Sequence, residues 1–387
     1  FATRKVATVS LLIAAVGYVV GIIGGQQMQI GDLDAGAPEL RPDSRYNLDN
    51  SFITGNYAVS SDIMVVMVET PQQACGLYRN LNLISKFGWY MENVPGVQSV
   101  VSMADVVKLT YMAFNEGNPR WFTLSRRQRA IDGGLQNVPP GLMNRDCSLA
   151  MVVLFLDDHK AETISTVVDA AQTFQQEFGN EQVHFALAAG NAGVEAATNE
   201  EIAVAQSQIL LLVYGVVAAL VFLSFRSSIA VYCIIIPLGL TTVLCQALMA
   251  YLGIGLKVAT LPVVALGVGV GVDYGIYIYN RLTDYLKKGL PMQEAYYQAL
   301  STTGRAVAFT GLALGVGVIT WTLSPIKFQA DMGILLTFMF LWNMVGALWL
   351  LPALAQLLIK PYKLADSTEP PDNKTDLASS EWLGPRL

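Results

Sequence analysis

The sequence predicts an α-helical polytopic membrane domain of six spans together with one α/β domain outside the membrane. Three observations support this fold class. Of the 387 residues, 53% are hydrophobic and only 14% are charged, whereas a soluble domain carries about 25% charged residues. The deficit of charge is confined to six stretches. A long polar segment with strand and helix patterns separates the first stretch from the other five.

Each uncharged stretch is long enough to cross a bilayer, which takes about 20 apolar residues. Five lie between Lys5 and Asp32, Glu201 and Arg226, Arg226 and Lys257, Arg305 and Lys327, and Asp331 and Lys360. The sixth lies between Lys257 and Arg281 and is interrupted only by Asp273. The apolar run 6–23 is longer than the h-region of a signal peptide and lacks a clear cleavage site. We therefore interpret it as the first span.

We divide the chain into four parts. Residues 1–30 hold the first span, 31–201 form the polar domain, 202–363 form a five-span bundle, and 364–387 form a charged, Pro-rich tail. The composition of this tail is typical of disorder. Because the chain begins with Phe1 and not with methionine, we expect it to be a piece of a longer protein.

The distribution of charge predicts the orientation in the membrane. If the spans alternate in direction, nearly all basic residues near span ends fall on one side, which the positive-inside rule assigns to the cytoplasm. Both termini and the 281–305 loop are then cytoplasmic, and 31–201 is periplasmic in a bacterial inner membrane. The 31–201 domain holds 21 acidic and 11 basic residues. This acidic balance excludes a basic nucleic-acid-binding surface.

The 31–201 domain shows the element order of a ferredoxin-like split βαβ unit. Apolar, β-branched runs predict strands, and helical spacing of apolar residues predicts helices. The predicted strands are 63–69, 97–101, 148–156 and 183–187, and the predicted helices are 72–94 and 161–178. Residues 103–146 are an insertion between the two halves of the unit.

The cysteines and histidines suggest no metal site. Cys75 and Cys147 both lie in the outside domain, where oxidation is possible. Because the sequence does not give their Cα separation, a disulfide and two unpaired buried thiols both remain open. Cys233 and Cys245 lie in a span and are interpreted as small apolar residues. His159 and His184 are isolated in the sequence, outside the spans.

Asp273 is the one ionisable residue inside the predicted spans. A charge at this depth costs at least ~2.5–3.5 kcal/mol, so the side chain should face protein or water, or be protonated. A carboxyl group that gains or loses a proton when its access to water changes is suited to a protein whose activity is coupled to proton movement. The alternative is an acid that only hydrogen-bonds neighbouring spans. An intramembrane aspartyl protease would need a second carboxylate, which these spans lack, and we expect no enzyme.

Glycines around Asp273 indicate a closely packed helix. Gly267, Gly271 and Gly275 recur every four residues, as in small-residue helix contacts, and Gly269 shares this spacing with Asp273 on a neighbouring face. We assign all four glycines to helix packing. A nucleotide-binding loop is excluded because no strand precedes them. Candidate partners of Asp273 are Tyr274 and, in the next span, Thr310 and Thr320.

With these motifs the chain resembles the C-terminal half of a resistance-nodulation-division (RND) transporter, closest to the hydrophobe/amphiphile efflux and MMPL-like branch. The most specific segments are GVGVDYGIYIYNR and TTGRAVAFTGLALGVGVITW, and the resemblance extends over about 4–363. It implies that 31–201 is a porter domain and that an N-terminal half with six more spans completes the transporter. It also implies a proton relay formed by Asp273, Tyr274 and Thr310.

The resemblance leads to one main hypothesis and one alternative. The main hypothesis is the C-terminal half of a proton-motive-force-driven exporter of lipids or other hydrophobic molecules, with protons as the coupling ion and no cofactor. Its expected partners are membrane lipids, a hydrophobic substrate and the N-terminal half, and homo-oligomerisation is left open. The alternative is a non-pumping, lipid-binding scaffold like a sterol-sensing domain, in which Asp273 only packs.

Overall fold

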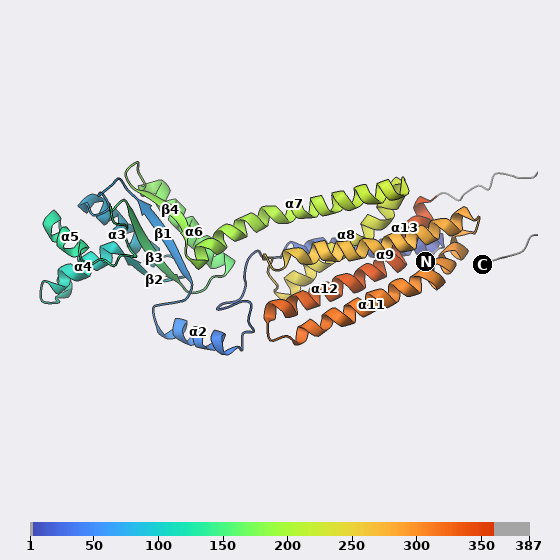
Figure 1. Cartoon of the computed structure of the whole chain (residues 1–387), viewed down its shortest axis with the longest axis horizontal. Helices are drawn as coiled ribbons and strands as arrows, with labels where there is room; N and C mark the ends of the chain where they lie inside the picture. Colours follow the sequence, from blue (N-terminus) through green and yellow to red (C-terminus); the bar gives the residue numbers. More distant parts are fainter. Residues whose placement is uncertain (1–2, 360–387) are drawn as a thin grey trace, which may run out of the picture.

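The computed structural model describes residues 3–359 of the chain. It is elongated, with an α/β domain at one end and a bundle of long helices at the other (Figure 1). Helix α1 begins and helix α13 ends at the end of the bundle farthest from the α/β domain (Figure 1). The predicted tail, 364–387, lies outside the described residues.

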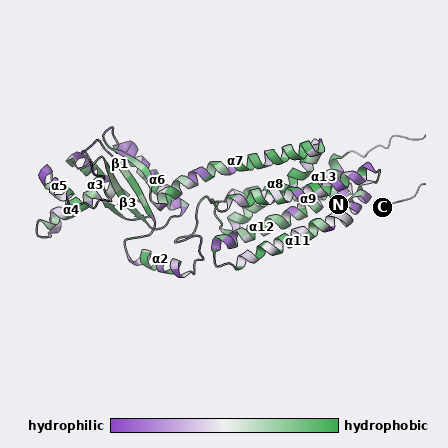
Figure 2. Ribbon diagram, in the orientation of Figure 1, coloured by the Kyte–Doolittle hydropathy of each residue, from purple (hydrophilic) through white to green (hydrophobic). Residues whose placement is uncertain are grey.

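Six helical segments of the described chain are long and apolar enough to cross a membrane. They are α1 (Arg4–Gly25), α7 (Asn191–Phe225), α8 (Ser228–Leu252), α9 (Leu261–Lys287), Met292–Leu323 and Lys327–Leu358. The fifth combines α10 (Met292–Ala299) and α11 (Arg305–Ile319), and the sixth combines α12 (Lys327–Val345) and α13 (Leu351–Leu358). Figure 2 shows that hydrophobic residues dominate these helices. The prediction of six spans is therefore met by length and composition.

The helices of the bundle are unequally covered. Helix α8 and the sixth segment each bury 50% of their most apolar stretch inside the chain, whereas α7 buries only 11%. Helix α9 packs against both α8 and α12. The bundle therefore has a centre made by α8, α9 and α12, and it leaves wide apolar surfaces on its outside.

The α/β domain contains a four-stranded antiparallel sheet with the strand order β2-β3-β1-β4. The strands are β1 (Ile63–Glu69), β2 (Val97–Ser102), β3 (Leu149–Leu156) and β4 (His184–Ala189). Helix α3 (Tyr78–Glu92) connects β1 to β2, and α6 (Ala161–Phe178) connects β3 to β4. The remaining helices are α2 (Arg45–Asn56), α4 (Met103–Ala113) and α5 (Gln128–Leu135), the last two within the predicted insertion.

The hydrophobic core of this domain follows from strand alternation. Every second residue of β1 and β3 is buried, as expected when one face of a sheet is covered. Phe87 of α3 and Phe174 of α6 lie in the same core with ring centroids 5.1 Å apart, so the two helices cover the same side of the sheet. The predicted ranges of β1 and α6 are confirmed.

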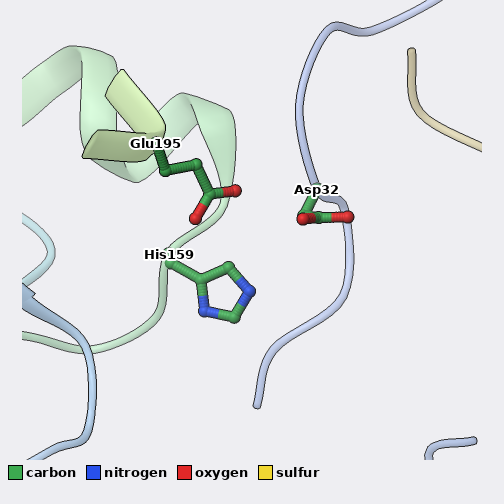
Figure 3. A group of neighbouring side chains, drawn as sticks. All are labelled: Asp32, His159 and Glu195. Carbon is green, nitrogen blue, oxygen red and sulfur yellow. The ribbon is translucent and has the colours of Figure 1, made fainter. Parts of the chain in front are cut away.

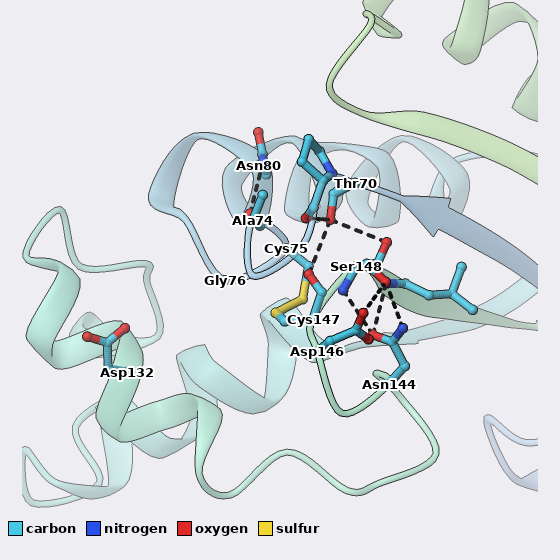
Figure 4. The surroundings of a disulfide bond; sticks show 12 residues. Thr70, Ala74, Cys75, Gly76, Asn80, Asp132, Asn144, Asp146, Cys147 and Ser148 are labelled. Atoms are coloured by element: carbon cyan, nitrogen blue, oxygen red, sulfur yellow. Dashed lines mark hydrogen bonds between the residues drawn. A yellow bond between two sulfur atoms is a disulfide. The ribbon is translucent and has the colours of Figure 1, made fainter.

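Helix α3 begins six residues later than predicted, because a disulfide-linked turn precedes it. Cys75 and Cys147 are joined by a disulfide bond, with their Cα atoms 5.2 Å apart (Figure 4). The Cys75 amide also donates a hydrogen bond to the Cys147 carbonyl at 3.0 Å. These contacts hold residues 71–77 in turns, so the helical spacing seen in the sequence starts before the helix itself.

Helix α7 crosses the predicted boundary between the α/β domain and the bundle. The boundary at 201 falls inside this helix, which runs unbroken for 35 residues. Between Val194 and Tyr214 the chain has no glycine or proline to end it. A helix of this length extends about 52 Å, which exceeds the ~30 Å hydrocarbon core of a bilayer. The α/β domain is thus continuous with a candidate span.

The disulfide leads to a prediction about stability. Replacing Cys75 and Cys147 by serine should lower the free energy of unfolding of the α/β domain by roughly 2–4 kcal/mol, because the link restricts a long loop in the unfolded chain. Chemical denaturation of the purified protein measures this loss. Dithiothreitol should lower the midpoint of the wild type and leave the double-serine variant unchanged. A denaturation midpoint of the wild type that is the same with and without dithiothreitol would contradict the prediction.

Candidate functional site

The buried face of α9 is a glycine stripe in close contact with two neighbouring helices. A Cβ atom at Gly271 would lie 2.5 Å from the side chain of Asn343 on α12 and 2.6 Å from Leu238 on α8. At Gly275 it would lie 3.0 Å from Ile234 on α8. Real side chains do not tolerate a contact of 2.5 Å, so a residue without a Cβ is required where α9 crosses α12.

A buried hydrogen bond holds the same crossing together. Asn343, which is 2% exposed, donates a hydrogen bond from Nδ2 to the main-chain carbonyl of Gly267 at 2.7 Å. Gly267 also leaves room for the side chain of Met339. A buried amide with a bonded donor fixes the register of α9 on α12, because sliding the helices would leave that donor unpaired.

Gly269 does not belong to this stripe, and no other described helix packs on it. It is exposed, and a Cβ placed there would meet no atom within 4 Å in the part of the chain that the structure describes. Two residues along an α-helix correspond to a rotation of about 200°. Gly269 therefore lies opposite Gly267 and Gly271, on the outward face of α9.

Asp273 lies on this outward face. Its side chain is exposed, and among residues 3–359 it forms no hydrogen bond or ion pair. Tyr277, one turn further along, is 59% exposed and shares the face. We call the surface formed by Gly269, Asp273 and Tyr277 the Asp273 face.

The neighbouring Tyr274 points in another direction. It is 3% exposed and packs in the core of the bundle, and its hydroxyl has no hydrogen-bond partner within the described chain. Adjacent residues of a helix are separated by a rotation of about 100°, which explains why one side chain is covered and the other is not. No hydrogen bond joins Tyr274 to Asp273 in the described structure.

Thr310 is on α11 and is also exposed. Helices α9 and α11 both pack against α12, which lies between them (Figure 1). No described hydrogen bond links Thr310 to Asp273. Thr320 donates a hydrogen bond to the Gly317 carbonyl of its own helical turn at 2.7 Å, as threonines in spans commonly do. Within residues 3–359, the three predicted relay residues thus do not form one hydrogen-bonded network.

A second group of polar side chains lies where the α/β domain meets the bundle. Asp32, in the segment after α1, pairs with Lys257 of the α8–α9 loop at 2.6 Å. Asp34 pairs with Lys327 at the start of α12, and Arg41 donates to the carbonyls of Thr322 and Ser324 at 2.8 Å. These bonds fasten the segment after α1 to the nearby loops of the bundle.

His159 belongs to this junction, so the prediction that it is isolated is wrong. Its Nδ1 atom lies 3.0 Å from Asp62, and Asp32 and Glu195 are close by (Figure 3). Burial lowers the pKa of His159, but the hydrogen bond and charge of Asp62 and the charges of Glu195 and Asp32 outweigh it. The pKa is therefore raised above its ordinary value of 6.5. Sequence spacing missed this cluster because each acid comes from a different segment.

Comparison with known proteins identifies the family. The family model of the MMPL family matches residues 98–383. The chain belongs to the MMPL family. This membership and the six candidate spans make it a multi-pass membrane protein, and the resemblance to the MMPL-like branch is confirmed.

Individual relatives match shorter stretches. The chain is 30% identical over 151 residues to a membrane protein of Methanocaldococcus jannaschii, in an alignment covering 38% of this chain and 39% of the relative. It is 26% identical over 153 residues to the sulfolipid-1 exporter MmpL8 of Mycobacterium tuberculosis, covering 38% of this chain and 13% of the exporter. The alignments thus span less than half the length of these relatives.

Because the two faces of α9 are packed differently, a glycine-to-alanine substitution should change the stability of the bundle in opposite directions on the two faces. Gly271→Ala should destabilise the bundle by roughly 1–3 kcal/mol, because the added methyl group overlaps Asn343 and Leu238. Gly269→Ala should be neutral or slightly stabilising, since alanine favours a helix by about 1 kcal/mol over glycine. Thermal unfolding of both variants in detergent tests this. Equal shifts of the melting temperature would show that α9 is packed differently.

Proposed function

We propose that this MMPL-family chain forms one half of a proton-motive-force-driven exporter of lipids or other hydrophobic molecules, with Asp273 as the group that carries the proton. The observation that supports this proposal most strongly is the Asp273 face. In the middle of a candidate span it presents an ionisable side chain that has no hydrogen-bond or ion-pair partner among residues 3–359. Family membership and a relative named as a sulfolipid-1 exporter support lipids as the class of substrate.

The Asp273 face requires another protein surface in the membrane. A carboxylate exposed to hydrocarbon is costly, so side chains of this type face a protein interior or a water-filled cavity. The face is flat at Gly269, where a Cβ atom would meet no atom of the described residues within 4 Å. A helix of a second half with an equivalent set of spans would cover Asp273 and place its own polar groups against it.

Protonation of Asp273 would then decide between two arrangements of the halves. The neutral acid tolerates an apolar contact, whereas the anion needs a cation, a donor or water. A proton that crosses the membrane supplies ~2.3 kcal/mol per 100 mV, enough to shift a two-state equilibrium roughly 50-fold, since 1.4 kcal/mol is tenfold. Tyr274 and Thr310 are proposed as further members of the proton path, Tyr274 because its buried hydroxyl has no partner in the described structure.

Helix α7 would carry this rearrangement to the α/β domain. It runs without a break from the domain into the bundle, so a tilt of its membrane part also moves its first turns. We propose that the α/β domain is a ferredoxin-like porter module in the periplasm. The strand order β2-β3-β1-β4, with a helix inside each half of the unit, supports the ferredoxin-like assignment. The bias of basic residues supports cytoplasmic termini in a bacterial inner membrane.

Asp273→Asn tests the proposed function. The complete transporter is reconstituted in phosphatidylethanolamine–phosphatidylglycerol vesicles, and transfer of a fluorescent phospholipid between leaflets is followed after a pH gradient is imposed. The variant should lose at least about tenfold in rate, because it cannot exchange a proton. Asp284→Asn, the same change near the end of α9, serves as the control and should retain transport.

Two outcomes would contradict the proposal. Transfer by Asp273→Asn at the wild-type rate would remove Asp273 from the mechanism. A wild-type protein that binds the phospholipid but transfers it at the same slow rate with and without the gradient would favour the non-pumping scaffold.

A second substitution tests the contact of the Asp273 face with another helix. Gly269→Leu adds a side chain to a surface that is open in this chain. The variant should leave the melting temperature of the helix bundle unchanged. It should reduce transfer of the fluorescent phospholipid severalfold, because the helix that covers the Asp273 face could no longer approach. Normal transport by this variant would show that the face is not covered by protein.

A further inference from the structure

The polar junction between the α/β domain and the bundle contains a cluster of one buried and two partly buried side chains that the proposed function does not use. Asp32 comes from the segment after α1, His159 from the segment between β3 and α6, and Glu195 from the first turns of α7. Figure 3 shows the three side chains converging from these separate segments. One ligand-type atom of each residue lies within 4.8 Å of the other two.

His159 is held with one ring nitrogen aimed at the two acids. The residue is 5% exposed, and its Nδ1 lies 3.0 Å from Oδ1 of Asp62. Because a carboxylate can only accept, Nδ1 carries the hydrogen, so loss of the second proton from the ring leaves the lone pair on Nε2. Nε2 is buried and has no partner in the described structure. This is the arrangement of a metal-binding histidine whose second nitrogen is fixed by a carboxylate.

The carboxylates beside His159 are not fully neutralised by protein. Asp32, Asp62 and Glu195 surround the ring, and the one lysine bonded to them is Lys257, on Oδ1 of Asp32. The nearby Lys160 pairs with Asp158 instead. The Oε1 atom of Glu195 is buried and accepts no described hydrogen bond. Buried carboxylates in excess of cations are unfavourable unless a further positive charge is supplied.

We propose that Asp32, His159 and Glu195 form a binding site for a divalent transition-metal ion and that Zn²⁺ fits it best. One imidazole nitrogen and two carboxylate oxygens are common Zn²⁺ ligands, with bonds of roughly 2.0–2.2 Å and a fourth position for water. Tetrahedral geometry places such donors roughly 3.3 Å apart, so the cluster needs to contract by about 1.5 Å at most. Mg²⁺ and Ca²⁺ fit less well because they prefer oxygen ligands only.

The positions of the ligands define what the ion does. Asp32 leads into the first span and Glu195 lies on the helix that continues into the second, while His159 belongs to the α/β domain. A bound ion would therefore fasten the α/β domain to two spans at once. This role depends on the junction alone and stands whether or not Asp273 carries a proton.

Metal titration tests the site. Purified protein in detergent is stripped with EDTA and titrated with ZnCl₂ in a calorimeter, and we expect one ion bound per chain. His159→Gln, Glu195→Gln and Asp32→Asn should each weaken binding at least about tenfold, and Asp62→Asn about 10- to 100-fold. The matched control is His184→Gln, since His184 is largely exposed on β4 and should not contribute. Glu195→Gln is nearly isosteric, so its loss of zinc affinity tests the site even if the His159 variant does not fold.

X-ray absorption at the zinc edge gives a second readout. The spectrum should show nitrogen and oxygen ligands with one imidazole and no sulfur, because the free thiols of Cys233 and Cys245 lie buried in α8. The proposal is overturned if binding does not saturate, if it survives all three ligand substitutions, or if sulfur ligates the ion.

Discussion

The cost of placing a carboxylate in hydrocarbon governs how this chain can be arranged in a membrane. Asp273 sits in the middle of α9, and the helix turns that side chain away from the centre of its own bundle. Glycines on the opposite face allow close contact with α8 and α12, and the bond from Asn343 to Gly267 fixes that orientation. The internal packing of the bundle therefore forces the acid outward. An outward acid is unfavourable in hydrocarbon unless protein, water or a proton compensates it, and this cost connects the fold to the proposed exchange of protons between two halves.

The continuity of helix α7 couples the α/β domain to the membrane-spanning bundle over a long distance. Helix α7 runs through the domain boundary, and the segment after α1 is fastened to loops of the bundle by Lys257, Lys327 and Arg41. The α/β domain is thus tied to the bundle by one rigid element and by several polar contacts. A movement within the spans has a direct physical route to the sheet, and the His159 cluster lies on that route.

Patterns within single segments predicted much of the fold. Six stretches without charge apart from Asp273 predicted the spans, and the spacing of apolar residues predicted β1 and α6 with the ranges that the structure has. Features that depend on contact between distant segments were harder to predict. The start of α3 was missed because a disulfide-linked turn stands before it, and the drop in polarity at 201 did not show that α7 continues through this position. At the site, spacing alone could not show which face of α9 the other described helices cover, so Gly269 was grouped with the glycines of the packed stripe. The partners of His159 come from separate segments and gave no local signal.

The proposed function requires Asp273 to exchange a proton within the membrane. Infrared difference spectroscopy of the complete transporter in lipid bilayers measures this directly, since a protonated carboxyl group has its own C=O stretching band. We expect a band that appears as the pH is lowered through the titration of one membrane-embedded acid and that is absent from Asp273→Asn. An identical pH-dependent band in wild type and variant would contradict it.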